Sequence, residues 1–218
     1  MKLLTARLLI VSVFATLAAG CSSLLPKAAP PPAFYTLDGA ALRTDRPQTM
    51  GQGPTLIVSP PHAAAGFDSN RMIYLRQAHH LEYFAHSEWV DTPARMAAPL
   101  MVAALQRSVA LRAVLLAPGS AAGDLRLDTE ILRLQHEFTS TPSRVRLTLR
   151  ATLVDSATRR VLAWREFDHV ALAASEDAYG GVVAAHAAWQ AVLASLVVFS
   201  EDAARLWPLP PATPLPRP

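Results

Sequence analysis

The stretch from residue 144 to residue 153, RVRLTLRATL, decides the fold class. Its apolar residues alternate with arginine and threonine, as on an antiparallel strand that has one buried and one solvated face. Residues 125–131, LRLDTEI, repeat the alternation, and residues 155–160 form a turn into a further strand at 161–167. The row of arginines is typical of a solvated sheet face. A surface for phosphate or lipid headgroups is the alternative.

A long helix is predicted to close the domain, from about residue 176 to residue 207. Apolar residues recur there at steps of three and four, which places them on one seam of a helix. The seam consists of Val182, Ala185, Trp189, Val192, Leu196, Phe199, Ala203 and Leu206. Residues 182–199 are also apolar enough for a membrane span. However, His186 and Gln190 lie inside that run and no basic residue flanks it closely, so we expect the helix to pack on the sheet.

The first half of the domain supplies shorter elements. Three β-rich runs lie at residues 55–59, 71–76 and 81–85, and the last two are close enough for a hairpin. Thr92 and Pro93 match a helix N-cap followed by proline in the first turn, while Pro99 indicates either a kink or a later start near Ala98. A brief strand follows at 114–116. The order βββ-α-ββββ-α predicts a single α+β domain, with two main helices packed on an antiparallel or mixed sheet.

The chain begins with the features of a secretory signal. Lys2 and Arg7 precede an apolar stretch at residues 8–19, which is too short to span a bilayer. Cys21, the only cysteine, follows Ala18-Ala19-Gly20, as in a lipobox with alanine in place of the usual leucine. We predict a signal peptide over residues 1–20 and lipidation of Cys21. An ordinary signal peptide is the alternative, but it leaves a lone cysteine with no disulfide partner in the chain.

Proline-rich segments flank the predicted domain at residues 34–207. Residues 21–33 hold the lipidated cysteine and a Pro/Ala-rich spacer, which extends by about 3.1 Å per residue. Residues 208–218 contain six prolines and form a Pro-rich tail. Ser22 stands where an aspartate would retain an enterobacterial lipoprotein in the inner membrane. We therefore expect a lipid-anchored protein on the periplasmic face of the outer membrane, with the inner membrane as the alternative.

The composition and motifs favour a binding protein over an enzyme. Without Lys2 and Arg7 the chain has 18 basic and 17 acidic residues, so its charge gives no reason to expect nucleic acid. No two histidines have HExxH spacing, and His79, His80 and His86 are expected to be surface loop residues and not metal ligands. There is no GxxxxGK[ST] motif and no GxSxG motif. We expect no catalytic residue, metal site or cofactor.

Several short motifs follow one another in a definite order behind Cys21. They are Phe34-Tyr35-Thr36-Leu37, Ile57-Val58-Ser59-Pro60, Phe67-Asp68 before Arg71-Met72-Ile73-Tyr74-Leu75-Arg76, Glu82-Tyr83-Phe84 before Glu88-Trp89, and Asp155-Ser156-Ala157-Thr158. In their order and spacing the chain resembles the ABC-type transport auxiliary lipoproteins, a family that includes the outer-membrane component of the paraquat-inducible MCE transport system. The resemblance extends over roughly residues 34–206.

The resemblance implies a non-catalytic partner of an MCE/ABC-type intermembrane lipid transport system. An inner-membrane ABC permease and ATPase would work with a periplasmic MCE-domain protein, which the lipoprotein would dock at the outer membrane as one copy or as a homo-oligomeric ring. Tyr74, Arg76 and Trp89 are candidate contact residues, because Tyr, Trp and Arg often anchor interfaces; they could equally be core or sheet-face residues. A structural or regulatory lipoprotein, such as a cell-wall synthase activator or an assembly factor, is the alternative function, and a periplasmic hydrolase is a third.

Overall fold

The computed structural model describes residues 31–37 and 53–207. The chain divides into two units, residues 1–31 and 32–218, and all the helices and strands named below belong to the second. Predictions for the signal peptide, Cys21, most of the spacer and the Pro-rich tail lie outside the described residues. The elements are, in order, β1 (Ala33–Tyr35), β2 (Thr55–Val58), β3 (His62–Ala63), β4 (Arg71–Gln77), β5 (His80–Trp89), α2 (Pro93–Leu105), β6 (Ala113–Leu116), β7 (Leu125–Glu137), β8 (Arg144–Asp155), β9 (Val161–Leu172) and α3 (Ala178–Arg205).

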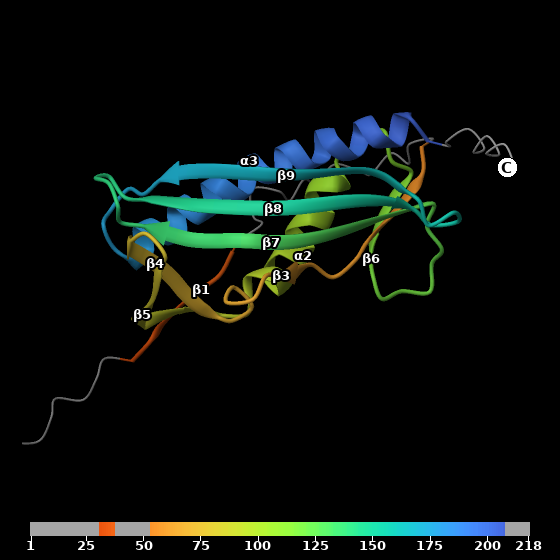
Figure 1. Ribbon diagram of the computed structural model, residues 1–218. Helices are drawn as coiled ribbons and strands as arrows, with labels where there is room; N and C mark the ends of the chain where they lie inside the picture. Colours follow the sequence, from red (N-terminus) through yellow and green to blue (C-terminus); the bar gives the residue numbers. More distant parts are fainter. Residues whose placement is uncertain (1–30, 38–52, 208–218) are drawn as a thin grey trace, which may run out of the picture. The chain divides into compact units, whose positions relative to one another are not determined.

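The predicted α+β fold with two helices on a mixed sheet is confirmed. The described strands form one nine-stranded sheet, in which β7 is the central strand (Figure 1). On one edge β7 pairs antiparallel with β8, which pairs antiparallel with β9. On its other edge β7 pairs in parallel with β2, β3 and β4 in turn. β6 extends the sheet beyond β2, and β5 and β1 extend it beyond β4.

The alternation of residues 144–153 gives β8 one buried and one polar face, as predicted. Val145, Leu147, Leu149, Ala151 and Leu153 of β8 are all buried beneath the helices. The intervening arginines and threonines lie on the opposite, polar face. The predicted order of elements is present, with two additional short strands, β1 and β3.

Helix α2 starts where its capping residues place it. The Thr92 hydroxyl accepts a hydrogen bond from the Arg95 backbone N–H at 3.4 Å, and Pro93 occupies the first turn, where proline costs no hydrogen bond. Pro99 lies inside the helix, so the alternative start near Ala98 is wrong. The ring of Pro99 is exposed, on the side of the helix that faces away from the core.

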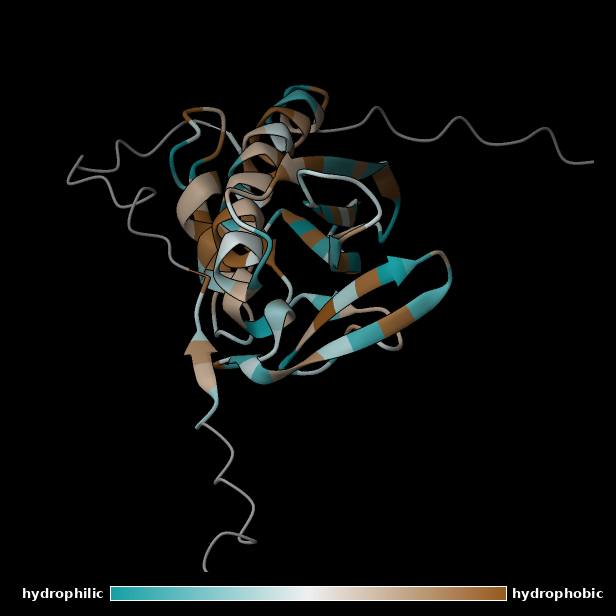
Figure 2. Cartoon of the chain, turned by 90° about the vertical axis from the view of Figure 1, so that its left-hand side faces the viewer, coloured by the Kyte–Doolittle hydropathy of each residue, from teal (hydrophilic) through white to brown (hydrophobic). Residues whose placement is uncertain are grey.

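Helix α3 buries the predicted seam against β8 and β9. Asp177 caps its N-terminus by accepting a hydrogen bond from the Gly180 backbone N–H at 2.7 Å. Every seam residue from Val182 to Ala203 is buried. Leu206 is an exception: it lies just beyond the last helical residue and is 72% exposed. Both helices cover the same face of the sheet (Figure 2).

The apolar composition of α3 is therefore that of a core helix. Its length and hydropathy would suit a membrane span, but half of its most apolar window is buried inside the domain. Trp189, at the middle of the seam, is 1% exposed. The helix thus packs on the sheet, as the sequence predicts.

Replacing Trp189 or Leu196 with alanine should lower the melting temperature sharply. Both side chains are buried, and such truncations cost about 3–5 kcal/mol for an aromatic and about 2–5 kcal/mol for a leucine. A domain holds only about 5–15 kcal/mol in total. The measurement is thermal unfolding, without detergent, of a chain that starts at Ser22. Gln190→Ala is the control, since Gln190 is exposed on the same helix. A Trp189→Ala protein that melts like the parent would contradict the packing of α3.

Candidate functional site: a docking surface

The β4–β5 hairpin brings two of the three predicted contact residues together. Tyr74 lies directly opposite Glu82 and donates its hydroxyl hydrogen bond to that carboxylate at 3.0 Å. Arg76, two residues further along β4, donates to the Tyr74 hydroxyl oxygen at 3.3 Å. Its guanidinium carbon lies 5.1 Å from the centre of the Tyr74 ring. Tyr74, Arg76 and Glu82 thus form one ordered, partly exposed group, which we call the hairpin triad.

Aromatic rings hold the hairpin triad in place. The Tyr74 ring packs on Phe84 with 4.7 Å between ring centres and meets Phe138 edge-on at 5.7 Å. Burial, and then the hydrogen bond to Glu82, raise the pKa of Tyr74. The phenol is therefore neutral at physiological pH and keeps its proton for Glu82. A fixed tyrosine and arginine need little further ordering when a partner binds.

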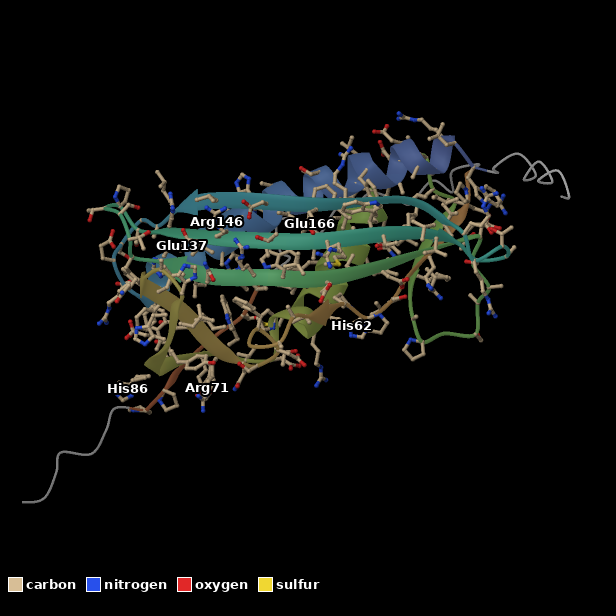
Figure 3. All side chains as sticks on the ribbon, viewed as in Figure 1. His62, Arg71, His86, Glu137, Arg146 and Glu166 are labelled. Atoms are coloured by element: carbon tan, nitrogen blue, oxygen red, sulfur yellow. The ribbon has the colours of Figure 1, made fainter. Side chains whose placement is uncertain are left out.

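A second arginine–tyrosine pair lies on the opposite face of the hairpin. Tyr83 pairs with Ile73, and neighbouring strand residues point to opposite faces, so Tyr83 faces away from Tyr74. The Arg71 guanidinium lies 4.9 Å from the Tyr83 ring centre, and Tyr83 is 42% exposed. Figure 3 shows Arg71 on the lower rim of the domain, near His86 of β5. Each face of the hairpin therefore presents a tyrosine beside an arginine.

Trp89 does not join this surface. It is 4% exposed and belongs to the hydrophobic core, beside Tyr35 of β1. The pairing of β4 and β5 shifts between Arg71 and Ile73, which interrupts the alternation of faces along β5. This position agrees with the alternative that Trp89 is a core residue.

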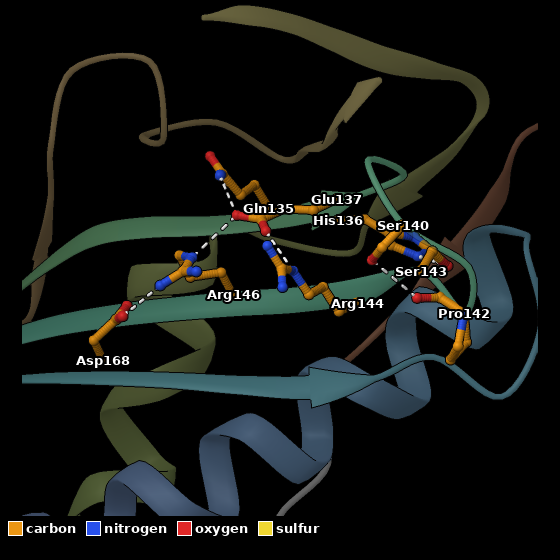
Figure 4. Close-up of polar contacts among 9 residues, drawn as sticks. All are labelled: Gln135, His136, Glu137, Ser140, Pro142, Ser143, Arg144, Arg146 and Asp168. Atoms are coloured by element: carbon orange, nitrogen blue, oxygen red, sulfur yellow. Dashed lines mark hydrogen bonds and ion pairs between the residues drawn. The ribbon is translucent and has the colours of Figure 1, made fainter. Parts of the chain in front are cut away.

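The arginine row of β8 is neutralised by carboxylates. Glu137, buried at the end of β7, accepts hydrogen bonds from Arg144 at 2.8 Å and from Arg146 at 3.1 Å (Figure 4). Arg146 also pairs with Asp168 of β9. Burial alone would raise the pKa of Glu137, but these two arginines and Gln135 hold it below its ordinary value. The carboxylate therefore stays ionised.

The remaining arginine of the row has two carboxylate partners. Arg150 of β8 pairs with Glu130 of β7 at 3.3 Å and with Glu166 of β9 at 2.7 Å. All three β8 arginines thus have acidic partners. This arrangement supports a solvated sheet face over a surface for phosphate or lipid headgroups.

A buried polar group links the end of the sheet to α3. His136 Nε2 and the Ser143 hydroxyl lie 2.8 Å apart, and the Ser143 backbone N–H donates to Glu176 at 2.8 Å. The residue types are those of a hydrolase, but Ser143 is fully buried and lies between the other two groups. Its hydroxyl cannot reach a substrate. The contacts instead join the β7–β8 hairpin to the residues just before α3.

His136 sits tightly against the start of α3. A side chain on Gly181 would bring its Cβ within 2.5 Å of His136 Nδ1, so this contact requires glycine. Nδ1 has no hydrogen-bond partner among the described residues, and a cavity of about 20 Å³ beside it has room for one water molecule. His136 has no signal in the sequence, because Ser143 and Glu176 lie 7 and 40 positions further along the chain.

Of the three histidines expected in a surface loop, only His79 lies in one, the β4–β5 turn, with a positive φ of 65°. His80 and His86 are exposed residues of strand β5, so the loop expectation is wrong for these two. Within residues 31–37 and 53–207 no three His, Cys, Asp or Glu side chains are grouped so that they could hold a metal ion.

Lowering the pH below about 6.5 should destabilise the folded protein through His136. Burial lowers its pKa in the folded state, against the opposing charges of Glu176 and Asp177. In the unfolded chain this histidine has an ordinary pKa of about 6.5, so below that pH it binds a proton that it does not bind in the folded chain. The unfolding free energy should fall below that pH, with a slope of up to about 1.4 kcal/mol per pH unit.

Urea unfolding between pH 7.5 and pH 5 measures this slope. His136→Gln should flatten it, because the amide does not titrate and can still bond to Ser143. Carboxylates with lowered pKa values, such as Glu137, lose their contribution only nearer their ordinary pKa of 4.5 and do not interfere in this range. An equal slope in parent and variant would show that His136 takes up a proton freely in the folded state.

Comparison with known proteins identifies the family. The chain folds into an α+β domain with one polar sheet face, and the model of the ABC-type transport auxiliary lipoprotein component matches residues 35–198. The chain therefore belongs to this family, which confirms the resemblance. Its members are lipoproteins, which places the protein in the cell envelope as a membrane-anchored component associated with an ABC-type transport system.

Solved structures support the same fold. A crystal structure of a Xanthomonas campestris protein is similar with a TM-score of 0.68 and 22% identity, over 79% of this chain and 97% of that chain. A crystal structure of an uncharacterized protein has a TM-score of 0.61 and 13% identity, over 78% of this chain and 99% of that one. No curated protein matches the sequence significantly.

Proposed function

We propose that this protein is the outer-membrane auxiliary component of an intermembrane lipid transport system of the MCE/ABC type. In this proposal it docks the far end of a periplasmic MCE-domain protein, while an inner-membrane permease and ATPase supply the energy. The family match over residues 35–198 is the observation that carries the proposal. The hairpin triad adds a preformed arginine–tyrosine surface of the kind that anchors protein interfaces.

The protein has no catalytic role in this proposal. The buried Ser143–His136 pair is consistent with that, since its position gives it a structural task. Lipid anchoring through Cys21 would hold the domain at the membrane. Residues 22–32 would then reach about 30 Å at about 3.1 Å per residue, and they enter the domain at β1, beside β5 of the hairpin.

Replacing Cys21 with alanine should release the protein from the membrane. The proposal makes the lipid on Cys21 the only anchor, since α3 is packed inside the domain. The measurement is the distribution of parent and variant between soluble and outer-membrane fractions after washing at high salt. The parent should be found with the outer membrane. If the Cys21→Ala protein stays there too, the anchor is a different part of the chain.

The double change Tyr74→Ala with Arg76→Ala should weaken binding to the MCE-domain protein by tenfold or more. Hot-spot truncations cost about 2 kcal/mol or more, and about 1.4 kcal/mol corresponds to a factor of ten. The measurement is the Kd between the purified domain of this protein and the purified soluble domain of an MCE-domain protein from the same genome.

The matched control is Val198→Ala with Arg205→Ala. Both residues are exposed on the second half of α3, whereas the first turn of α3 lies against His136, which pairs with Tyr74 of the hairpin. An equal loss of affinity in both double variants would show that the hairpin is not part of the interface. Parent protein that binds no MCE-domain protein but copurifies with a cell-wall synthase would instead support the regulatory alternative.

A further inference from the structure

The long strand β9 has one unpaired edge. It pairs with β8 along one side, and no described strand pairs with the other side. β9 runs for 12 residues, whereas the edge strands β1 and β6 have 3 and 4. It contains neither proline nor lysine, two of the residues that protect such an edge, although it carries Arg165, Glu166 and Asp168 and its pairing with β8 shifts near Val161. Its outward backbone N–H and C=O groups can therefore accept another strand.

Exposed apolar groups gather beside this edge. A groove of about 240 Å³ lies between the first half of β9 and the last turns of α3. Trp164 of β9, 66% exposed, and Leu206, after α3, both line it, and Phe199 also lines it. An apolar side chain that enters this groove would shield these groups from water.

Two rows of alternating charge cross the sheet and end at the same edge. One row runs from Glu130 through Arg150 to Glu166. The other runs from Glu137 through Arg146 to Asp168 (Figure 4). Both rows begin and end with a carboxylate, and the side chains of Glu166 and Asp168 are 43% and 46% exposed. The next position in each row, beyond β9, suits a positive charge.

We propose that β9 accepts an extended segment of a partner protein as an additional strand. This segment carries basic side chains at two alternate positions, opposite Glu166 and Asp168. Apolar side chains flank the basic pair, opposite Trp164 and Val170, which lie on the same face of β9 as Glu166 and Asp168. The proposal adds a second contact to the docking function but does not depend on which transport component supplies the segment.

A second copy of this chain fits the middle of this edge poorly. Two β9 strands related by a two-fold axis would pair antiparallel, with the axis at a single residue. An axis at Arg165, Glu166 or Asp168 sets that residue against its own copy, and an axis at Phe167 sets Glu166 against Asp168. Each of these registers places like charges directly opposite each other, which is unfavourable. The other described strands with a free edge, β1, β5 and β6, contain no lysine or arginine.

A synthetic peptide tests the proposal without knowledge of the partner. The peptide has threonine at every second position, and the positions between hold valine, lysine, lysine and valine in that order. A matched peptide has glutamate in place of both lysines. Fluorescence anisotropy measures binding to the folded chain that starts at Ser22. The lysine peptide should bind about tenfold more tightly than the glutamate peptide, from two attractive cross-strand pairs in place of two repulsive ones. Hydrogen exchange should show new protection of the outward backbone N–H groups of β9.

Variants locate the binding site. Glu166→Gln with Asp168→Asn should weaken binding of the lysine peptide by about tenfold. Glu130→Gln is the matched control, because it removes the other partner of Arg150 two strands away from the edge, and it should bind like the parent. Thermal unfolding checks that each variant is folded.

Four outcomes would overturn the proposal. They are equal binding of both peptides, an equal loss of binding in the control variant, hydrogen-exchange protection outside β9, and β9 amides that are already protected by self-association. The hairpin variants test the proposed function separately, since they lie on other strands.

Discussion

β7 is hydrogen-bonded along both of its edges, and most of the domain is arranged around this strand. On one edge it pairs with β8 over its full length, and on the other it meets β2, β3 and β4 one after another. The three short strands come from a segment far earlier in the chain. They must all align with β7 before the β4–β5 hairpin has a fixed place. The hairpin triad therefore depends on long-range pairing, and its position is set by the far end of β7, where Tyr74 lies opposite His136.

One irregularity in β7 determines where the polar groups go. The pairing with β8 shifts between Ile131 and Arg133, so the two halves of β7 turn different residues toward the helices. Beyond the shift Leu134 and His136 face α3, while Glu137 faces the arginines of β8. Without the shift these faces would be exchanged, and an ionised carboxylate would lie against α3. The bulge thus allows a strand with charged residues to continue beneath a helix.

The sequence is informative where its periodicity is uninterrupted. The alternation in β8 and the seam of α3 predict both elements correctly, because each residue's direction follows from the regular repeat. The sequence predicts β7 only as far as Ile131, since the register shift ends the simple alternation there. Tyr74 and Arg76 are two apart on a strand, so their shared face follows from the sequence, but Glu82 becomes their partner only through the hairpin register. The burial of Trp89 depends on the shifted pairing of β5, and the contact between His136 and Gly181 depends on the packing of α3. Neither the burial of Trp89 nor the contact between His136 and Gly181 can be predicted from the neighbouring residues in the sequence.

The alternating charges of β7, β8 and β9 also affect how a partner approaches. Because arginines and carboxylates are interleaved, their fields largely cancel within the sheet, and at physiological ionic strength any remainder decays over about 8 Å. This face therefore exerts little attraction on a distant molecule, and the rate of encounter should vary only weakly with salt. The carboxylates of Glu166 and Asp168 at the β9 edge act only after contact, when they determine which strand remains bound. In the proposed function the frequency of encounter then depends on confinement, because a lipid-anchored domain searches a thin layer of the envelope and not its whole volume.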